Sequence, residues 1–318
     1  RTIWRFPLRK HLKARFPFLN NIRLAESVSM DTIFSSVPAL GGRTCAQIFY
    51  GVSSHMINVY GMKSESEVPI AYQDFMRNEG IPSLLRRDMS KAQMSDKIST
   101  LNRDNIVEDA WSEPYHQQQN PVELNAVRWL KSNMQILLDR SGAPAEEWLT
   151  CIEYLADVHN IVADESLGFQ TPMYKRSGMI PDISAYLHFH YYQLVLCLDS
   201  EESFPKSKEI YAYWVGVAKH VGDSLTYKLR NPATGKLLYR SVVRPANDEV
   251  HPNNRLVHPS DIHPSGGIVD EETGELATGE LSTGEIPATT PLPDPLSYRK
   301  PLPIDIIHDL KNMNKKKL

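Results

Sequence analysis

The chain has few cysteines and no long hydrophobic run. Its 318 residues include three cysteines, Cys45, Cys151 and Cys197, and none of them belongs to a CxxC pair. This spacing argues against a disulfide framework or a zinc ribbon and favours a reducing compartment. Because no stretch of 18 apolar residues exists, we expect no membrane span. The hydrophobic fraction of 41% is ordinary for a globular protein with a proper core.

Each end of the sequence lacks one kind of residue. Residues 1–23 contain no acid, and the first acidic residue is Glu26. Such a basic arm suits a polyanionic partner, although a solvated surface segment of a larger domain has the same composition. Apolar residues are scarce in 248–318, where ETGEL, ATGEL and STGEI repeat in tandem, so we expect a disordered or extended tail. Since the chain begins with Arg1, we expect it to be a piece of a longer polyprotein.

Between these ends, the apolar pattern changes its period several times. Residues 27–60 read as three strands, and an amphipathic helix and a short strand that ends at Asp88 follow. The clearest helix covers 121–140, and a second long helix starts near Pro144. This order predicts an α/β fold with a mixed sheet flanked by helices. Short strands with turns return in 185–247 and predict a small β-barrel.

Three acids occupy unusual positions in this pattern. Asp31 lies inside an apolar strand, where a carboxylate needs solvent, a partner or a metal ion. Asp88 ends a strand and Glu123 begins a helix. Taken singly, Asp31 and Asp88 also fit surface or turn acids. Glu123 also fits a capping role, because Asn120 is a good N-cap, Pro121 suits the first turn, and Asn-x-x-Glu approximates a capping box.

One observation favours chemistry over capping for Glu123. The helix carries an apolar stripe at steps of four and three residues behind this glutamate, formed by Val127, Leu130, Met134 and Leu137. Glu123 therefore lies at the end of the buried stripe, where a charge needs a partner. Together with Asp31 and Asp88 it could hold two Mg²⁺ ions, for which Mn²⁺ is an alternative. Such ions clamp the attacking and leaving oxygens of a phosphodiester.

The segments that carry these acids, in this order and spacing, resemble the integrase of copia-type LTR retrotransposons. DTIFSSVPALGGRTCAQIFYG resembles the first catalytic strand and its hairpin, and EPYHQQQNPVE resembles the loop before the catalytic glutamate. The resemblance covers about residues 15–245 and implies an RNase H-like five-stranded core at 25–184, after an arm at 1–24. KEIYAYWVGVAKHVGDSLTYKLRNPATGKLLYRSVV is similar to an SH3-like β domain at 185–247.

The resemblance implies a reaction and its partners. Asp31, Asp88 and Glu123 would be the catalytic and metal-binding residues of a Mg²⁺-dependent enzyme that processes the 3′ ends of element DNA and joins them to target DNA. It further implies a homo-multimer without a membrane association. The implied location is the nucleus, reached from a virus-like particle or a pre-integration complex.

Four further residues are candidates for contact with DNA. Tyr115 and Gln118 lie in the loop that, by resemblance, contacts DNA near the active site. A polar loop with a packed tyrosine explains them equally well. Arg128 and Lys131 could meet phosphates, although a solvated helix face also explains them.

Two positions depart from the family pattern. Arg87 stands where the family has Ser or Thr, and Leu124 stands where it has Arg. Two alternatives to an integrase therefore stay open. One is a catalytically inactive remnant that only binds nucleic acid, and the other is an RNase H-like nuclease that acts by hydrolysis.

Overall fold

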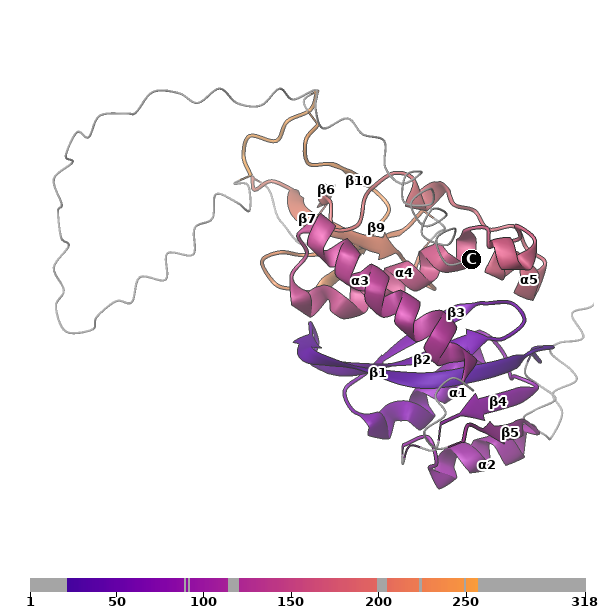
Figure 1. The fold of residues 1–318 in the computed structure, drawn as a ribbon. Helices are drawn as coiled ribbons and strands as arrows, with labels where there is room; N and C mark the ends of the chain where they lie inside the picture. Colours follow the sequence, from indigo (N-terminus) through magenta and orange to yellow (C-terminus); the bar gives the residue numbers. More distant parts are fainter. Residues whose placement is uncertain are drawn as a thin grey trace, which may run out of the picture. The chain divides into compact units, whose positions relative to one another are not determined.

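The computed structural model describes residues 22–88, 90, 92–113, 120–198, 205–222, 225–248 and 250–256. These residues form two five-stranded sheets within one compact unit. Helices α3 (Arg128–Ser141) and α4 (Trp148–Ile161) lie between the sheets, and α1 (Val68–Asn78) and α2 (Asp96–Asn105) cover the other face of the first sheet (Figure 1). Within the described ranges, no helix has the length and apolar character needed to span a membrane.

The first sheet is mixed, as the sequence predicts. Its strand order is β3-β2-β1-β4-β5, with antiparallel pairing from β3 to β1 and parallel pairing from β1 to β5. The strands are β1 (Ser27–Ala39), β2 (Arg43–Gly51), β3 (Ile57–Met62), β4 (Leu84–Arg87) and β5 (Glu108–Trp111). The sequence pattern gives no sign of β5, because the stretch EDAW has neither an apolar run nor an alternation.

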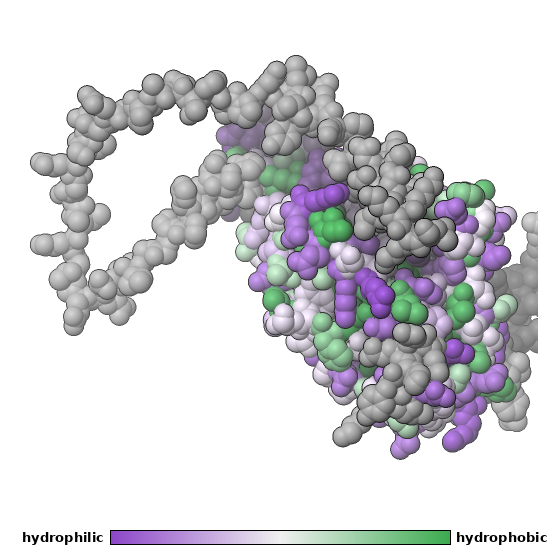
Figure 2. Space-filling view, viewed as in Figure 1, coloured by the Kyte–Doolittle hydropathy of each residue, from purple (hydrophilic) through white to green (hydrophobic). Residues whose placement is uncertain are grey.

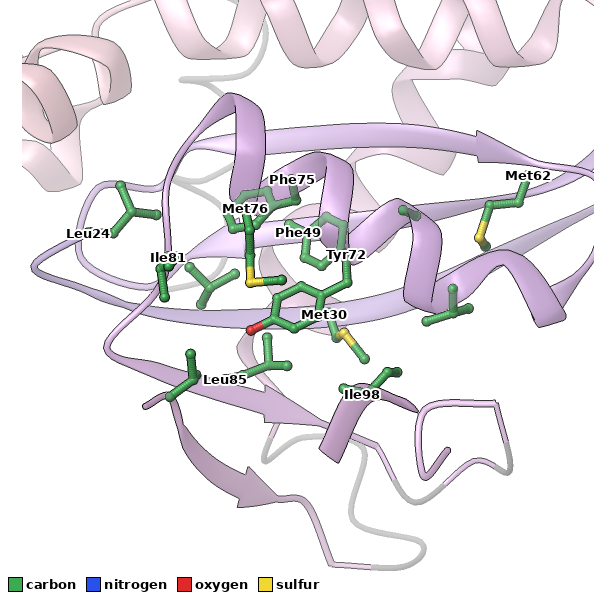
Figure 3. Close-up of a cluster of buried hydrophobic side chains, with 14 of the residues drawn as sticks. Leu24, Met30, Phe49, Met62, Tyr72, Phe75, Met76, Ile81, Leu85 and Ile98 are labelled. Atoms are coloured by element: carbon green, nitrogen blue, oxygen red, sulfur yellow. The ribbon is translucent and has the colours of Figure 1, made fainter. Parts of the chain in front are cut away.

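The two faces of β1 serve two different cores. Met30 points into a cluster beneath α1 and α2, where the ring of Phe49 stacks on Phe75 with centroids 4.5 Å apart (Figure 3). Ile33 belongs to the opposite cluster, which packs against α3 and α4. Because successive side chains of a strand alternate, Asp31 shares the face of Ile33 and therefore faces α3.

Short helical turns complete this half of the fold. They are η3 (Glu65–Glu67), η5 (Glu123–Val127), η6 (Ala145–Glu147), η7 (Glu165–Leu167), α5 (Pro172–Ser177) and η8 (Ser184–Tyr186). Arg176 of α5 reaches back to the start of β1, where its Nε donates to Glu26 at 2.7 Å. This bond ties the stretch after α4 to the first sheet.

The second sheet is antiparallel throughout and has the order β10-β6-β7-β8-β9. Its strands are β6 (Leu194–Leu198), β7 (Glu209–Val217), β8 (Tyr227–Arg230), β9 (Leu237–Arg240) and β10 (Val243–Pro245). Fully buried Trp214 is at the centre of its core. The return of β-structure after residue 185 is therefore confirmed.

The second sheet is fastened to α4 by charges and aromatic rings. Glu147, which is 1% exposed, accepts from Nε of Arg230 at 2.6 Å and from its Nη2 at 3.0 Å. Two helical turns further along, the ring of Tyr154 meets Trp214 edge-on with centroids 5.6 Å apart. Lys228 of β8 also bonds Glu153 of α4 at 2.5 Å. The helix layer is consequently held from both sides.

The ends of the described region bear on three predictions. Arg23, the last basic residue of the arm, donates to the carbonyls of Asn105 at 2.5 Å and Ile106 at 2.9 Å, and so holds the C-terminus of α2. Residues 1–21 of the predicted arm and nearly all of the predicted tail lie outside the described residues. The domain boundaries at 24, 184 and 247 stay predictions.

Candidate active site

The register of the first sheet brings two of the three acids side by side. β1 and β4 run parallel, and Ser29 pairs with Arg86. The pairing ends there, two positions before Asp31 in β1 and two before Asp88, which directly follows β4. Neighbouring strands lie about 4.8 Å apart. The two acids are therefore neighbours at the end of β4, and the charge of Asp88 acts on Asp31.

The third acid comes from the start of the α3 layer. Glu123 opens a π-helical turn in which its carbonyl accepts from the N–H of Arg128, five residues on. A π turn inserts one residue into an α-helix and is frequent at functional sites. Glu123 is half-buried, whereas Val127 and Leu130 behind it are buried, so the glutamate does stand at the edge of the buried stripe.

The predicted capping role of Asn120 is wrong. Its side-chain amide donates to the carbonyl of Met30 at 3.3 Å, and its Oδ1 has no hydrogen-bond partner among the described residues. Only its backbone carbonyl serves the helix, by accepting from the N–H of Glu123 at 3.2 Å. The side chain thus ties the beginning of the helix to β1, one residue before Asp31, and brings Glu123 to the strand.

The pKa of Asp31 responds to both of the other acids. Burial is the largest cause, and together with a hydrogen bond to the Glu123 carboxyl and the charges of Glu123 and Asp88 it raises the pKa of Asp31 to about 7. The N–H of Thr32 bonds its Oδ1 at 2.8 Å and acts in the opposite direction. The sequence predicts that repulsion raises at least one pKa here. The direction is confirmed, with burial as the largest cause.

The donor set fits a hard divalent cation. Asp31, Asp88 and Glu123 supply carboxylate oxygens, which are the ligands that Mg²⁺ prefers, and Mg²⁺ keeps several waters of its own. A bound cation would also offset the cost that raises the pKa of Asp31. Within the described residues, no three His, Cys, Asp or Glu side chains already stand in a metal-ligand arrangement.

The two basic residues of α3 that are candidates for DNA contact are exposed beside the three acids. Arg128 and Lys131 line a shallow groove along α3 that begins at Glu123 and also includes Ser132, Gln135 and Ile136. Hydrophilic and hydrophobic residues are interspersed over the described surface in view (Figure 2). The other two predicted DNA contacts, Tyr115 and Gln118, lie outside the described residues.

Sequence reasoning missed a group of residues behind Asp88. Arg87 is fully buried and forms a two-pronged ion pair with Asp109, through Nε at 2.9 Å and Nη2 at 2.7 Å. Strand alternation from buried Leu85 could have placed Arg87 inward, but nothing in the sequence identifies Asp109 as its partner. Leu124, the other departure from the family pattern, is 38% exposed.

No protein-family model matches this sequence, and no curated protein matches it either.

Proposed function

We propose that this protein is a divalent-metal-dependent DNA strand-transferase of the integrase kind, with an RNase H-like core. Asp31, Asp88 and Glu123 would hold Mg²⁺, or Mn²⁺ in its place. The observation that carries the proposal is the place of Asp31 inside the central strand, close enough to the carboxyl groups of Glu123 and Asp88 for both to raise its pKa.

Each carboxylate has a distinct structural support. Bound metal ions would activate the attacking hydroxyl and stabilise the leaving 3′-oxygen during in-line displacement at a phosphodiester. Asp31 sits in the central strand and shares a proton with Glu123, so it must release that proton to serve as a ligand. Asp88 is fixed at the end of β4, and Glu123 comes from a helix start tied to β1.

Two further features support a DNA substrate and the proposed architecture. Arg128 and Lys131 stand along a groove that starts at Glu123, where they can meet the phosphates of a strand that enters the site. In the second sheet, the last strand pairs with the first, and the other strands follow in chain order. This order supports an SH3-like barrel. Element-end DNA, target DNA and a homo-multimer are the partners that the proposal includes.

An inactive remnant is the second candidate, and Arg87 weighs against it. In a decaying sequence, a mutation that places an arginine in the core without a partner buries an unpaired guanidinium, which is strongly destabilising. Here the guanidinium is paired with Asp109 in bidentate geometry. Leu124 is partly exposed and occupies no ligand position, so it does not disturb the carboxyl groups.

A strand-transfer assay on blunt donor DNA with Mg²⁺ tests the proposal. We expect joined product from the wild type and none from Glu123→Gln. Asp139→Asn, which neutralises an exposed acid on the same helix, serves as the matched control and should behave as the wild type. Absence of joined product from the wild type would sink the proposal. Hydrolysis without joining would indicate a nuclease, and DNA binding alone would indicate the remnant.

A further inference from the structure

We propose that Arg87 and Gln93 form a positioning clamp on the peptide that joins Arg87 to Asp88, and that this clamp aims the Asp88 carboxylate. The inference rests on the proposed function, since it concerns how one of the proposed metal ligands is held. Neither Arg87 nor Gln93 reaches the substrate or the metal in this account, so both are positioning residues.

Both polar groups of that peptide are held. The carbonyl of Arg87 accepts from the N–H of Ser112 at 3.1 Å, just beyond β5. The N–H of Asp88 donates to Oε1 of Gln93 at 2.7 Å. A peptide unit fixed at its carbonyl and at its N–H cannot rotate, so the direction of the Cα–Cβ bond of Asp88 is restricted as well. A residue at the very end of a strand otherwise lacks this restraint.

Gln93, whose side chain accepts from the N–H of Asp88, is itself bound by the guanidinium of Arg87. Nη1 of Arg87 donates to the carbonyl of Gln93, which is 1% exposed. The Gln93 backbone is thus linked to Arg87, the last residue of β4, and its side-chain amide to Asp88, the residue that follows. Because Arg87 carries a rigid planar fork, it can bind Asp109 on one side and the Gln93 carbonyl on the other, which a lysine cannot do.

Three more contacts make this clamp stiff. The Nδ2 of Asn102 donates to Asp109 at 2.7 Å, and the hydroxyl of Tyr72 donates to Oδ1 of Asn102 at 2.8 Å. The guanidinium carbon of Arg87 also lies 4.0 Å from the centroid of the Trp111 ring. The network therefore runs from α1 through α2 and β5 to β4, and it reaches the site through the Arg87–Asp88 peptide and the Gln93–Asp88 bond.

The network also explains the residue at position 87. A small hydroxyl side chain, as the resembled family has here, could not reach Asp109 and the Gln93 carbonyl together. Arg87 is therefore a specific part of this site, and its substitution should act on the metal ligands as well as on stability. Residues that orient metal ligands typically change metal affinity or activity by about 10- to 100-fold when substituted.

Two variants separate positioning from plain stability. Gln93→Leu keeps the volume of the side chain and removes the acceptor of the Asp88 N–H, and Arg87→Lys keeps the charge and removes the fork. Arg176→Lys is the matched control, because Arg176 is a largely buried guanidinium that pairs with the carboxylates of Glu26 and Glu79. It should lower the melting temperature and leave the three measurements below unchanged.

The measurements are hydrogen exchange at the Asp88 amide, Mg²⁺ affinity by calorimetry and single-turnover strand transfer. For Gln93→Leu we expect at least about 10-fold faster exchange, about 10-fold or more weaker Mg²⁺ binding, and a reduced kcat with an unchanged KM for donor DNA. Hydrogen exchange at the Asp88 amide can be measured in an inactive protein. A wild type that yields no joined product would therefore refute the proposed function, and the exchange measurement would still test the clamp. Native-like exchange, Mg²⁺ affinity and kcat in folded Gln93→Leu would overturn the clamp.

Discussion

Neutralising Asp31 should stabilise the metal-free protein at alkaline pH. Burial raises the pKa of Asp31 from 3.8 to about 7, so the folded state binds this proton more tightly than the unfolded state. The contribution of Asp31 to stability is fully present below pH 3.8 and is lost as the pH rises through about 7. Above that pH, the folded protein carries a costly ionised carboxylate that Asp31→Asn removes.

The size of the effect follows from the shift. A difference of 7 − 3.8 units at about 1.36 kcal/mol per unit gives an upper value of about 4 kcal/mol. For a domain of this size, 1 kcal/mol moves the melting temperature by about 2–4 °C, so we expect a rise on the order of 5–15 °C. The asparagine keeps an acceptor for the Thr32 N–H and can donate to Glu123, which makes it a close mimic of the protonated acid.

Thermal unfolding in a chelating buffer at pH 5 and pH 8 is the assay. We expect Asp31→Asn to melt well above the wild type at pH 8 and above it by a much smaller margin at pH 5. Addition of Mg²⁺ at pH 8 should narrow the gap, because a ligand at about 100 times its Kd stabilises the wild type by about 2.7 kcal/mol. Asp164→Asn is a control of opposite sign: burial raises the pKa of Asp164, but bonds to His55 and Ser166 outweigh it and lower the pKa. A variant Asp31→Asn that is no more stable than the wild type at pH 8 would refute the reasoning.

Three further predictions concern the helix layer. Arg230→Met leaves buried Glu147 without its partner and should cost about 3–5 kcal/mol in chemical denaturation, where a loss under 1 kcal/mol would contradict a closed ion pair. Arg128→Glu combined with Lys131→Glu should weaken DNA binding and lower the slope of log K against log salt by about 2 in a titration; an unchanged slope would remove both from the interface. Deletion of 185–256 exposes the apolar side of α4, so the remaining core should bind a hydrophobic dye or aggregate. A core that stays monomeric and melts cooperatively would contradict the packing of the second sheet on α4.

Some features of this protein follow from local sequence. Strands β1 to β3 are indicated by their apolar and β-branched residues, and the apolar stripe of α3 is indicated by its helical period. Both patterns follow directly from burial on one face of the element. The same stripe placed Glu123 at the edge of the buried face. Asp31 was conspicuous for a similar reason, since a carboxylate inside an apolar strand is costly without a partner.

Other features depended on which segments meet in space. The side chain of Asn120 bonds Met30 of β1 and leaves the helix uncapped, a choice that local capping rules cannot anticipate. Strand β5 has no pattern of its own, and Arg87 is tolerated only because that strand delivers Asp109. The sequence by itself determined strands β1 to β3, the apolar stripe of α3 and the unusual positions of the three acids, because each follows from the residues around it. Only the tertiary structure decided that Glu123 and Asp88 act on Asp31, because burial and long-range neighbours set the pKa of Asp31.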